Sequence, residues 1–134
     1  MYSFILSGAA YFLRPFLLLF ALIALIKGHH EPGGGFIAGL LASSAFILQH
    51  FVSGVSSWAS PWVRPHGFIA TGLSLALLSG MLSFWTNDPF MTGQWGYFLG
   101  IALGSPLLFD LGVCFAVLGS TLLIFSSLTS VQHD

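Results

Sequence analysis

Between two long apolar segments lies the stretch that decides the fold of this chain, Lys27-Gly28-His29-His30-Glu31-Pro32-Gly33-Gly34-Gly35-Phe36. It is the most polar and the most conformationally specific passage in the sequence. Pro32 fixes its own φ angle and favours an extended conformation at Glu31, while three consecutive glycines accept backbone angles that other residues avoid. We therefore expect a shaped turn that sets the angle at which the second apolar segment begins, with Phe36 wedged against a neighbour.

The composition is that of an integral membrane protein. Of the 134 residues, 56% are hydrophobic and 5% are charged, whereas ordinary soluble domains carry roughly 25% charged residues. This composition excludes a soluble enzyme, and the net charge of −1 does not suggest a nucleic-acid partner. The single cysteine, Cys114, lies in an apolar run and provides neither a disulfide nor a metal cluster, so no cofactor is expected. The sequence around Lys27 is no small-residue cleavage site, so the first apolar segment should stay in the mature protein.

The lengths of the apolar runs predict a single all-α membrane domain over residues 1–134, with four transmembrane helices in an antiparallel bundle. A spanning helix needs about 20 mostly apolar residues. The four segments that qualify cover approximately residues 10–27, 34–52, 66–85 and 106–129. Arg14 and Lys27 flank the first and are long enough to reach the interface. Pro15 suits a first helical turn, so Met1–Tyr11 is either an interfacial helix or an extension.

The connections between the segments carry the orientation signals. Arg14 and Arg64 fall on one side of the membrane and Lys27 on the other, which favours cytoplasmic termini. The tryptophans form two expected aromatic belts, Trp58 and Trp62 on one side and Trp85 and Trp95 on the other. The apolar portion of the third connection, residues 97–103, is too short to span and should be interfacial or covered by a partner.

Three of the expected helices carry small residues at a spacing of four. They are Gly35, Gly39 and Ser43; Gly72, Ala76 and Gly80; Gly112, Ala116 and Ser120. Small residues are common in membrane helices, but such stripes also mark faces where two helix backbones approach closely. Three stripes in one short chain favour a packing role. Four helices cannot use that much contact surface among themselves, so we infer neighbours from other chains.

Asp110 is the acid that the spanning requirement forces into the bilayer, because the fourth helix must begin near Pro106. Ionisable residues inside a membrane usually line an ion route, a proton relay or a buried pair. Alternatively, Asp110 lies near a helix N-terminus, where the helix dipole favours an anion. Asp110 lies roughly 200° around the helix from Gly112 and so does not share the small-residue stripe.

The histidines give a weaker signal. His29, His30 and Glu31 are adjacent in a turn, and adjacent positions seldom aim at one metal, so we expect a hydrated cluster and no metal site. A proton-handling role stays open because histidine titrates near neutrality. His50 and His66 should be interfacial caps. The glycines that precede the second helix lack the lysine of a nucleotide-binding loop, which excludes nucleotide binding.

Three motifs of the chain together resemble a known family. They are Gly28-His29-x-x-Pro32-Gly33-Gly34-Gly35-Phe36-x-x-Gly39, Asn87-Asp88-Pro89-Phe90 and Ser105-Pro106-Leu107-Leu108-Phe109-Asp110-Leu111-Gly112-Val113. These are similar to the signature turn, the segment after the third helix and the start of the fourth helix in the MnhB/MrpB family, whose members are subunits of the Mrp-type multisubunit cation/proton antiporters. His30 and Glu31 fall where the family varies, and Ala38 stands where a glycine is usual.

The resemblance implies a small accessory subunit, not an enzyme, in a hetero-oligomeric inner-membrane complex that exchanges Na⁺ for H⁺. Related subunits occur in K⁺/H⁺ antiporters and in ion-pumping membrane-bound hydrogenases, and the sequence leaves these hosts open. It also leaves two roles open. Either Asp110 and the glycine turn contribute to a sodium or proton route, or the chain is a structural brace in which Asp110 belongs to a buried pair.

Overall fold

The structure of the chain is a computed structural model that describes residues 4–28, 33–53, 64–90, 92–93, 95–98 and 101–131. Its elements follow one another as α1 (Phe4–Gly28), α2 (Gly34–Ser53), α3 (Pro65–Met81), the 3-10 helix η2 (Leu82–Thr86), β1 (Trp95–Phe98), β2 (Ile101–Gly104) and α4 (Ser105–Val131). Four described segments are long and apolar enough to cross a membrane: Phe4–Gly28, Gly34–Val52, Pro65–Thr86 and Ser105–Ser130. The predicted four membrane-spanning helices are therefore confirmed.

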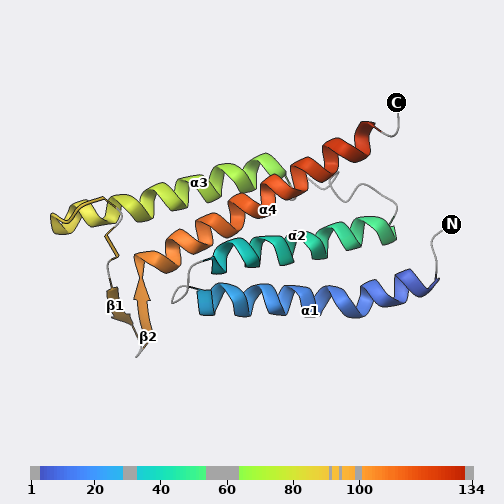
Figure 1. Cartoon of the computed structure of the whole chain (residues 1–134), viewed down its shortest axis with the longest axis horizontal. Coiled ribbons are helices and arrows are strands. Elements are labelled where there is room, and N and C mark those ends of the chain that lie inside the picture. Colours follow the sequence, from blue (N-terminus) through green and yellow to red (C-terminus); the bar gives the residue numbers. More distant parts are fainter. Residues whose placement is uncertain are drawn as a thin grey trace.

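The four long helices lie side by side in a row, in the order α1, α2, α4, α3 (Figure 1). Helices that follow one another in the chain run in opposite directions, so α2 and α4, which are neighbours in the row, run in the same direction (Figure 1). Lipid covers apolar side chains as well as protein does, so no hydrophobic force closes such a row into a compact bundle. Both faces of the row are therefore accessible to lipid or to other chains.

Helix α1 begins earlier than the sequence suggests. The sequence predicts a span over approximately residues 10–27, but the helix runs from Phe4 to Gly28 with Pro15 inside it. Pro15 has no N–H to donate to the carbonyl of Tyr11, so one backbone hydrogen bond is lost without ending the helix. The described part of Met1–Tyr11 is thus an extension of the span.

A short β-hairpin that the sequence did not predict precedes α4. Strands β1 and β2 are antiparallel, with Trp95 opposite Gly104 and Phe98 opposite Ile101. The hairpin includes most of the short apolar run at residues 97–103. It lies at the end of the row where α4 begins and where η2 follows α3 (Figure 1).

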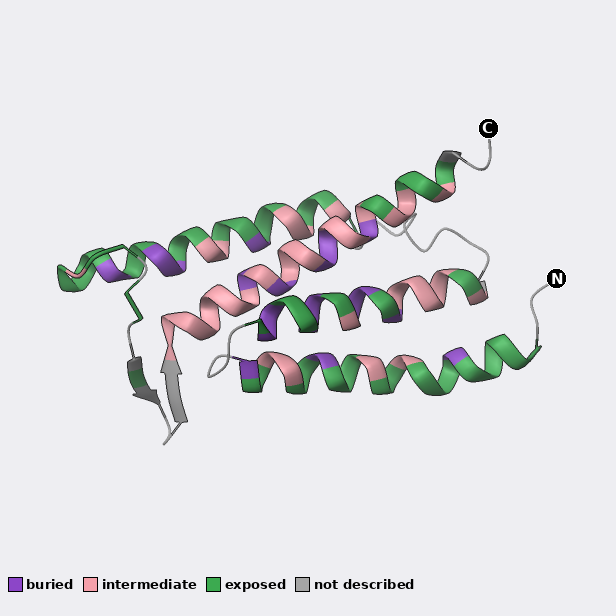
Figure 2. Ribbon diagram, viewed as in Figure 1, coloured by how far each residue is buried: buried purple, intermediate pink, exposed green. Residues whose placement is uncertain are grey.

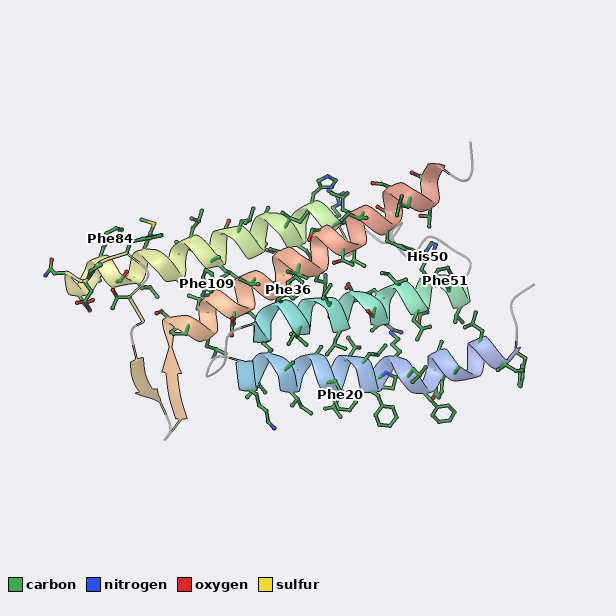
Figure 3. The ribbon with its side chains drawn as sticks, viewed as in Figure 1. Phe20, Phe36, His50, Phe51, Phe84 and Phe109 are labelled. Carbon is green, nitrogen blue, oxygen red and sulfur yellow. The ribbon has the colours of Figure 1, made fainter. Side chains whose placement is uncertain are left out.

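The interior of the chain is made mostly of small side chains. The buried apolar residues are Ala10, Ala21, Ala38, Ala42, Ala45, Cys114, Leu118 and Leu122. Helix α2 has the largest buried share and most of α4 is half-buried, whereas α1 is exposed along most of its length (Figure 2). Phe20, for example, projects from the side of α1 that faces away from α2 and is 57% exposed (Figure 3). The outer face of α1 is therefore a surface for lipid or for another chain.

Candidate ion-path acid and the helix contacts around it

The three consecutive glycines of the turn have different roles. Gly33 has a φ angle of +96°, and an added Cβ there would meet nothing within 4 Å. Gly34 and Gly35 are helical, and each would drive an added Cβ into the backbone of another helix. Backbone freedom is therefore needed at Gly33 alone, and closeness of packing accounts for the other two. His29 and Pro32, two further residues of the predicted signature, lie outside the described residues.

Gly34 holds α2 against α1. An added Cβ on Gly34 would contact the Cα of Gly28 and would lie 2.9 Å from the carbonyl oxygen of Ala24. Gly28 is buried and faces Gly34 in return. From the sequence, Gly28 was assigned only to the turn and this contact was missed, although two glycines flanking a short connection are a signal for it.

Gly35 and Gly39 hold α2 against α4. An added Cβ on Gly35 would run into the backbone carbonyl of Asp110. One turn later, a Cβ on Gly39 would lie 2.8 Å from the carbonyl oxygen of Cys114 and 2.8 Å from Cβ of Val117. The first residue of this stripe thus lies at the level of Asp110, the acid in the fourth span.

The opposite face of α4 packs on α3. A Cβ on Gly72 would lie 2.5 Å from the carbonyl oxygen of Gly112, and a Cβ on Gly112 would lie 2.7 Å from the amide nitrogen of Ala76. Further along, a Cβ on Gly119 would lie 2.6 Å from the carbonyl oxygen of Pro65. Gly119 could not be found by the spacing rule because it belongs to no stripe at a spacing of four.

These contacts correct one inference from the sequence. The small-residue stripes were expected to need neighbours from other chains, but Gly35, Gly39, Gly72 and Gly112 all pack against helices of the same chain. The other stripe residues are less uniform: Ser43 and Gly80 are buried, while Ala76, Ala116 and Ser120 are half-buried. Any surface for a partner must therefore be sought elsewhere, above all on α1.

Asp110 lies on the side of α4 that faces α2. It is five residues after Ser105, which places it about 7.5 Å along the helix axis from the first residue of α4. It is half-buried, and the residue beneath its backbone is Gly35. The start of α4, marked by Phe109 in Figure 3, lies at the same end of the row as the glycine turn and the hairpin. A carboxylate here can take up a cation or a proton, close to the N-terminal end of its helix.

The segment after α3 is held by local hydrogen bonds. Asn87 has a left-handed backbone, with φ of 59°, and ends η2. The hydroxyl of Thr86 donates to the Asp88 carboxylate at 2.8 Å, and the Asp88 amide donates to the carbonyl of Ser83 at 3.1 Å. The ring of Phe90 packs on that of Phe84, with centroids 5.8 Å apart (Figure 3 labels Phe84). This segment is a fixed corner at the end of the third span.

Of the remaining predicted positions, Phe36 directly follows Gly35 in α2, and the histidines that the structure describes lie in other parts of the molecule. Phe36 is 52% exposed, which leaves about half of its surface for lipid or for another chain. His50 packs edge-to-face on Phe125 of α4 and on its neighbour Phe51, at the other end of α2 (Figure 3). His66 is exposed in the first turn of α3. Residues 29–31 and the tryptophans Trp58 and Trp62 lie outside the described residues, so the expected His-His-Glu cluster and one aromatic belt are not described.

Arg14 lies deeper along α1 than expected for a residue that flanks the first span. Its Nη1 donates to Oε1 of Gln49 on α2 at 2.9 Å. Gln49 was not singled out from the sequence, although an amide within an apolar run is a signal for a polar contact between helices. Gln49 lies near the end of α2, whereas Asp110 lies near the start of α4, which runs in the same direction as α2.

Comparison with known proteins places these features in one family. The family described as "Domain related to MnhB subunit of Na+/H+ antiporter" matches residues 5–123. The chain is 36% identical to the B component of a Na(+)/H(+) antiporter of Bacillus subtilis, over 92% of this chain and 91% of that protein. It is 37% identical to the A/B component of a probable K(+)/H(+) antiporter of Rhizobium meliloti, over 95% of this chain and 13% of that much longer protein.

A solved structure has the same fold. In the "Structure of Mrp complex from Dietzia sp. DQ12-45-1b", one chain matches with a TM-score of 0.74 and 30% sequence identity. The match covers 86% of this chain and 13% of that one. Sequence and fold agree over most of the chain, and the chain therefore belongs to the family of MnhB-related membrane domains.

Proposed function

We propose that the chain is an accessory subunit of a multisubunit Na⁺/H⁺ antiporter in the cell membrane, and that Asp110 contributes to the ion route of that complex. The names of the relative from Bacillus subtilis and of the Dietzia complex support the first part. The second part is supported by the contact between Gly35 and the backbone of Asp110. Two motifs that are far apart in the sequence meet at the acid that lies inside the fourth span.

The position of Asp110 suits a route better than it suits a surface anchor. The residue is one to two turns inside α4 and half-buried. An embedded carboxylate is costly in lipid and persists where it has a function or a partner. In the competing role, Asp110 balances a cation of a neighbouring subunit. The two roles can be separated by neutralising Asp110 and measuring whether the complex still assembles.

The orientation that we propose has both termini in the cytoplasm. Arg14 and Arg64 lie toward one end of the row and Lys27 lies at the other, and short basic loops favour the cytoplasm. Asp110 and the glycine turn then lie in the outer half of the membrane. The acid would be the outward-facing part of a shared pathway.

A second candidate is a subunit of a K⁺/H⁺ antiporter. The relative from Rhizobium meliloti that is 37% identical carries that name. The chain's own residues do not choose between the two cations, because one carboxylate binds either. The choice depends on the subunits with which the chain assembles.

Deletion and re-supply of the chain test the proposal. Inverted membrane vesicles from cells lacking the chain should lose proton movement driven by added Na⁺, and the chain supplied in trans should restore it. The same vesicles assayed with K⁺ separate the two candidates. Proton movement that is unchanged by the deletion, with either cation, would contradict both.

A further inference from the structure

A groove between α1 and α2 is lined by both polar and apolar side chains. Its volume is about 570 Å³. Its polar lining residues are Ser7, Tyr11, Arg14 and Gln49, and Pro15, Phe16 and Leu18 are among its apolar ones. The ion route proposed above does not use this groove, because Asp110 is not among its lining residues.

Arg14 is the cation of the groove. One of its N–H groups donates to Gln49 at 2.9 Å, and a guanidinium carries five such donors. The acids that the structure describes, Asp88 and Asp110, lie toward the other end of the helices (Figure 1). Within the described part of the chain, Arg14 therefore has an amide partner but no carboxylate to balance its charge.

The depth of Arg14 suits a ligand that is charged at one end. Lys27 marks one membrane boundary, and Arg14 lies 13 residues before it, about 20 Å along the helix. Because the hydrocarbon core is about 30 Å thick, the Cα of Arg14 lies about 10 Å below the opposite boundary. Side chains on a helix point back toward its N-terminus, which directs the guanidinium toward that boundary. Pro15, Phe16 and Leu18 follow on the deeper side.

We propose that this groove binds an anionic phospholipid, with its phosphate on Arg14 and one acyl chain along Pro15, Phe16 and Leu18. Arginine pairs with phosphate through two parallel hydrogen bonds, and a basic pocket between membrane helices is a favourable site for such a headgroup. Arg14 offers a charge near the boundary, and Pro15, Phe16 and Leu18 offer apolar surface on its deeper side. The lipid would hold α1 against α2 at the end where no glycine contact joins them among the described residues.

Photocrosslinking in membranes tests the site. The full chain, in the complex with which it co-purifies, is placed in phosphatidylcholine vesicles that contain a trace of phosphatidylglycerol with a diazirine on its acyl chain. Crosslinks are mapped by peptide mass spectrometry. We expect phosphatidylglycerol to label residues 10–18 above the level given by a phosphatidylcholine probe. This comparison needs no variant.

Three variants test whether Arg14 is responsible for the labelling by phosphatidylglycerol. Arg14→Gln should lower labelling of this segment by about fivefold, since one basic residue near the surface contributes about 1 kcal/mol to anionic-lipid binding. Arg14→Lys should keep most of it, and Lys27→Gln, the same charge change at the other end of α1, should have no effect. Equal labelling by the two lipid probes in the wild-type complex overturns the proposal. So does a crosslink from position 14 to a carboxylate of another subunit. Loss of antiport activity alone bears on the proposed function and not on this site.

Discussion

The backbone of Gly35 lies directly against the backbone carbonyl of Asp110, with no room between them for a single methyl group. This contact joins the first turn of α2 to the first turns of α4. It fixes the depth of the embedded acid relative to the glycine turn. Neither helix can shift along the other at this point without separating.

The first prediction concerns this contact. Gly35→Ala should destabilise the chain by about 1–3 kcal/mol, because the added carbon meets backbone that cannot rotate away. Thermal unfolding of the detergent-purified chain measures the change. Gly8→Ala is the matched control, since an added Cβ at Gly8 meets nothing within 4 Å. Equal melting temperatures for the two variants would show that α2 and α4 are not packed this closely.

The second prediction concerns the packing of α3 on α4. Gly72→Ala should weaken this pair, because its Cβ would lie 2.5 Å from the Gly112 carbonyl oxygen, while Gly67→Ala on the same helix meets only the Arg64 side chain at 3.8 Å. Cysteines introduced at Ala76 and Leu111 report the approach of the helices through crosslinking yield. A lower yield for Gly72→Ala than for Gly67→Ala is expected. The reverse order contradicts the arrangement.

The third prediction separates the backbone role of Gly33 from crowding. Because its φ angle is +96° and the surrounding space is open, Gly33→Ala and Gly33→Ser should both cost about 1–2 kcal/mol. Their unfolding temperatures should be nearly equal. A much lower value for the serine variant would mean that a neighbour crowds the turn and that strain is not the cause.

The fourth prediction concerns orientation. With Cys114 replaced by serine, a membrane-impermeant thiol reagent added outside should reach Glu31→Cys and Gln94→Cys but not Ser57→Cys or His133→Cys. The distribution of Arg14, Arg64 and Lys27 is the reason. The opposite labelling pattern would reverse the proposed topology and place Asp110 in the inner half of the membrane.

The spans could be predicted from the sequence because run length alone decides them. Pro15 misled the placement of the first helix: a proline is favoured in a first turn, but a membrane helix also tolerates one in its interior. The hairpin at residues 95–104 was missed because this segment shows no alternation of polar and apolar residues. Its glycines, spaced by four, do not indicate strands either.

The candidate site could be predicted only in part. Asp110 was identified because the length of the fourth span forces it into the bilayer. The contact between Gly35 and Asp110 could not be predicted. A stripe of small residues shows that a helix packs closely, but it does not show against which helix. For the same reason the sequence could not show that Gly39 and Gly72 pack within the chain and do not require a neighbouring one. The pairing of Arg14 with Gln49 depends on the register of α1 on α2, which sequence spacing does not give.

The most direct test of an ion route through this chain is Asp110→Asn, a nearly isosteric change that removes the charge. Proton movement driven by Na⁺ is measured in vesicles and normalised to the amount of intact complex, with Asp88→Asn as the control for loss of an acid at the same end of the molecule. We expect Asp110→Asn to lose antiport while the complex assembles normally, and Asp88→Asn to keep it. Breaking a buried ion pair costs about 3–5 kcal/mol. Loss of assembly would therefore indicate that Asp110 has a structural role in a buried pair. Wild-type antiport and wild-type assembly together would contradict any role of Asp110 in the route.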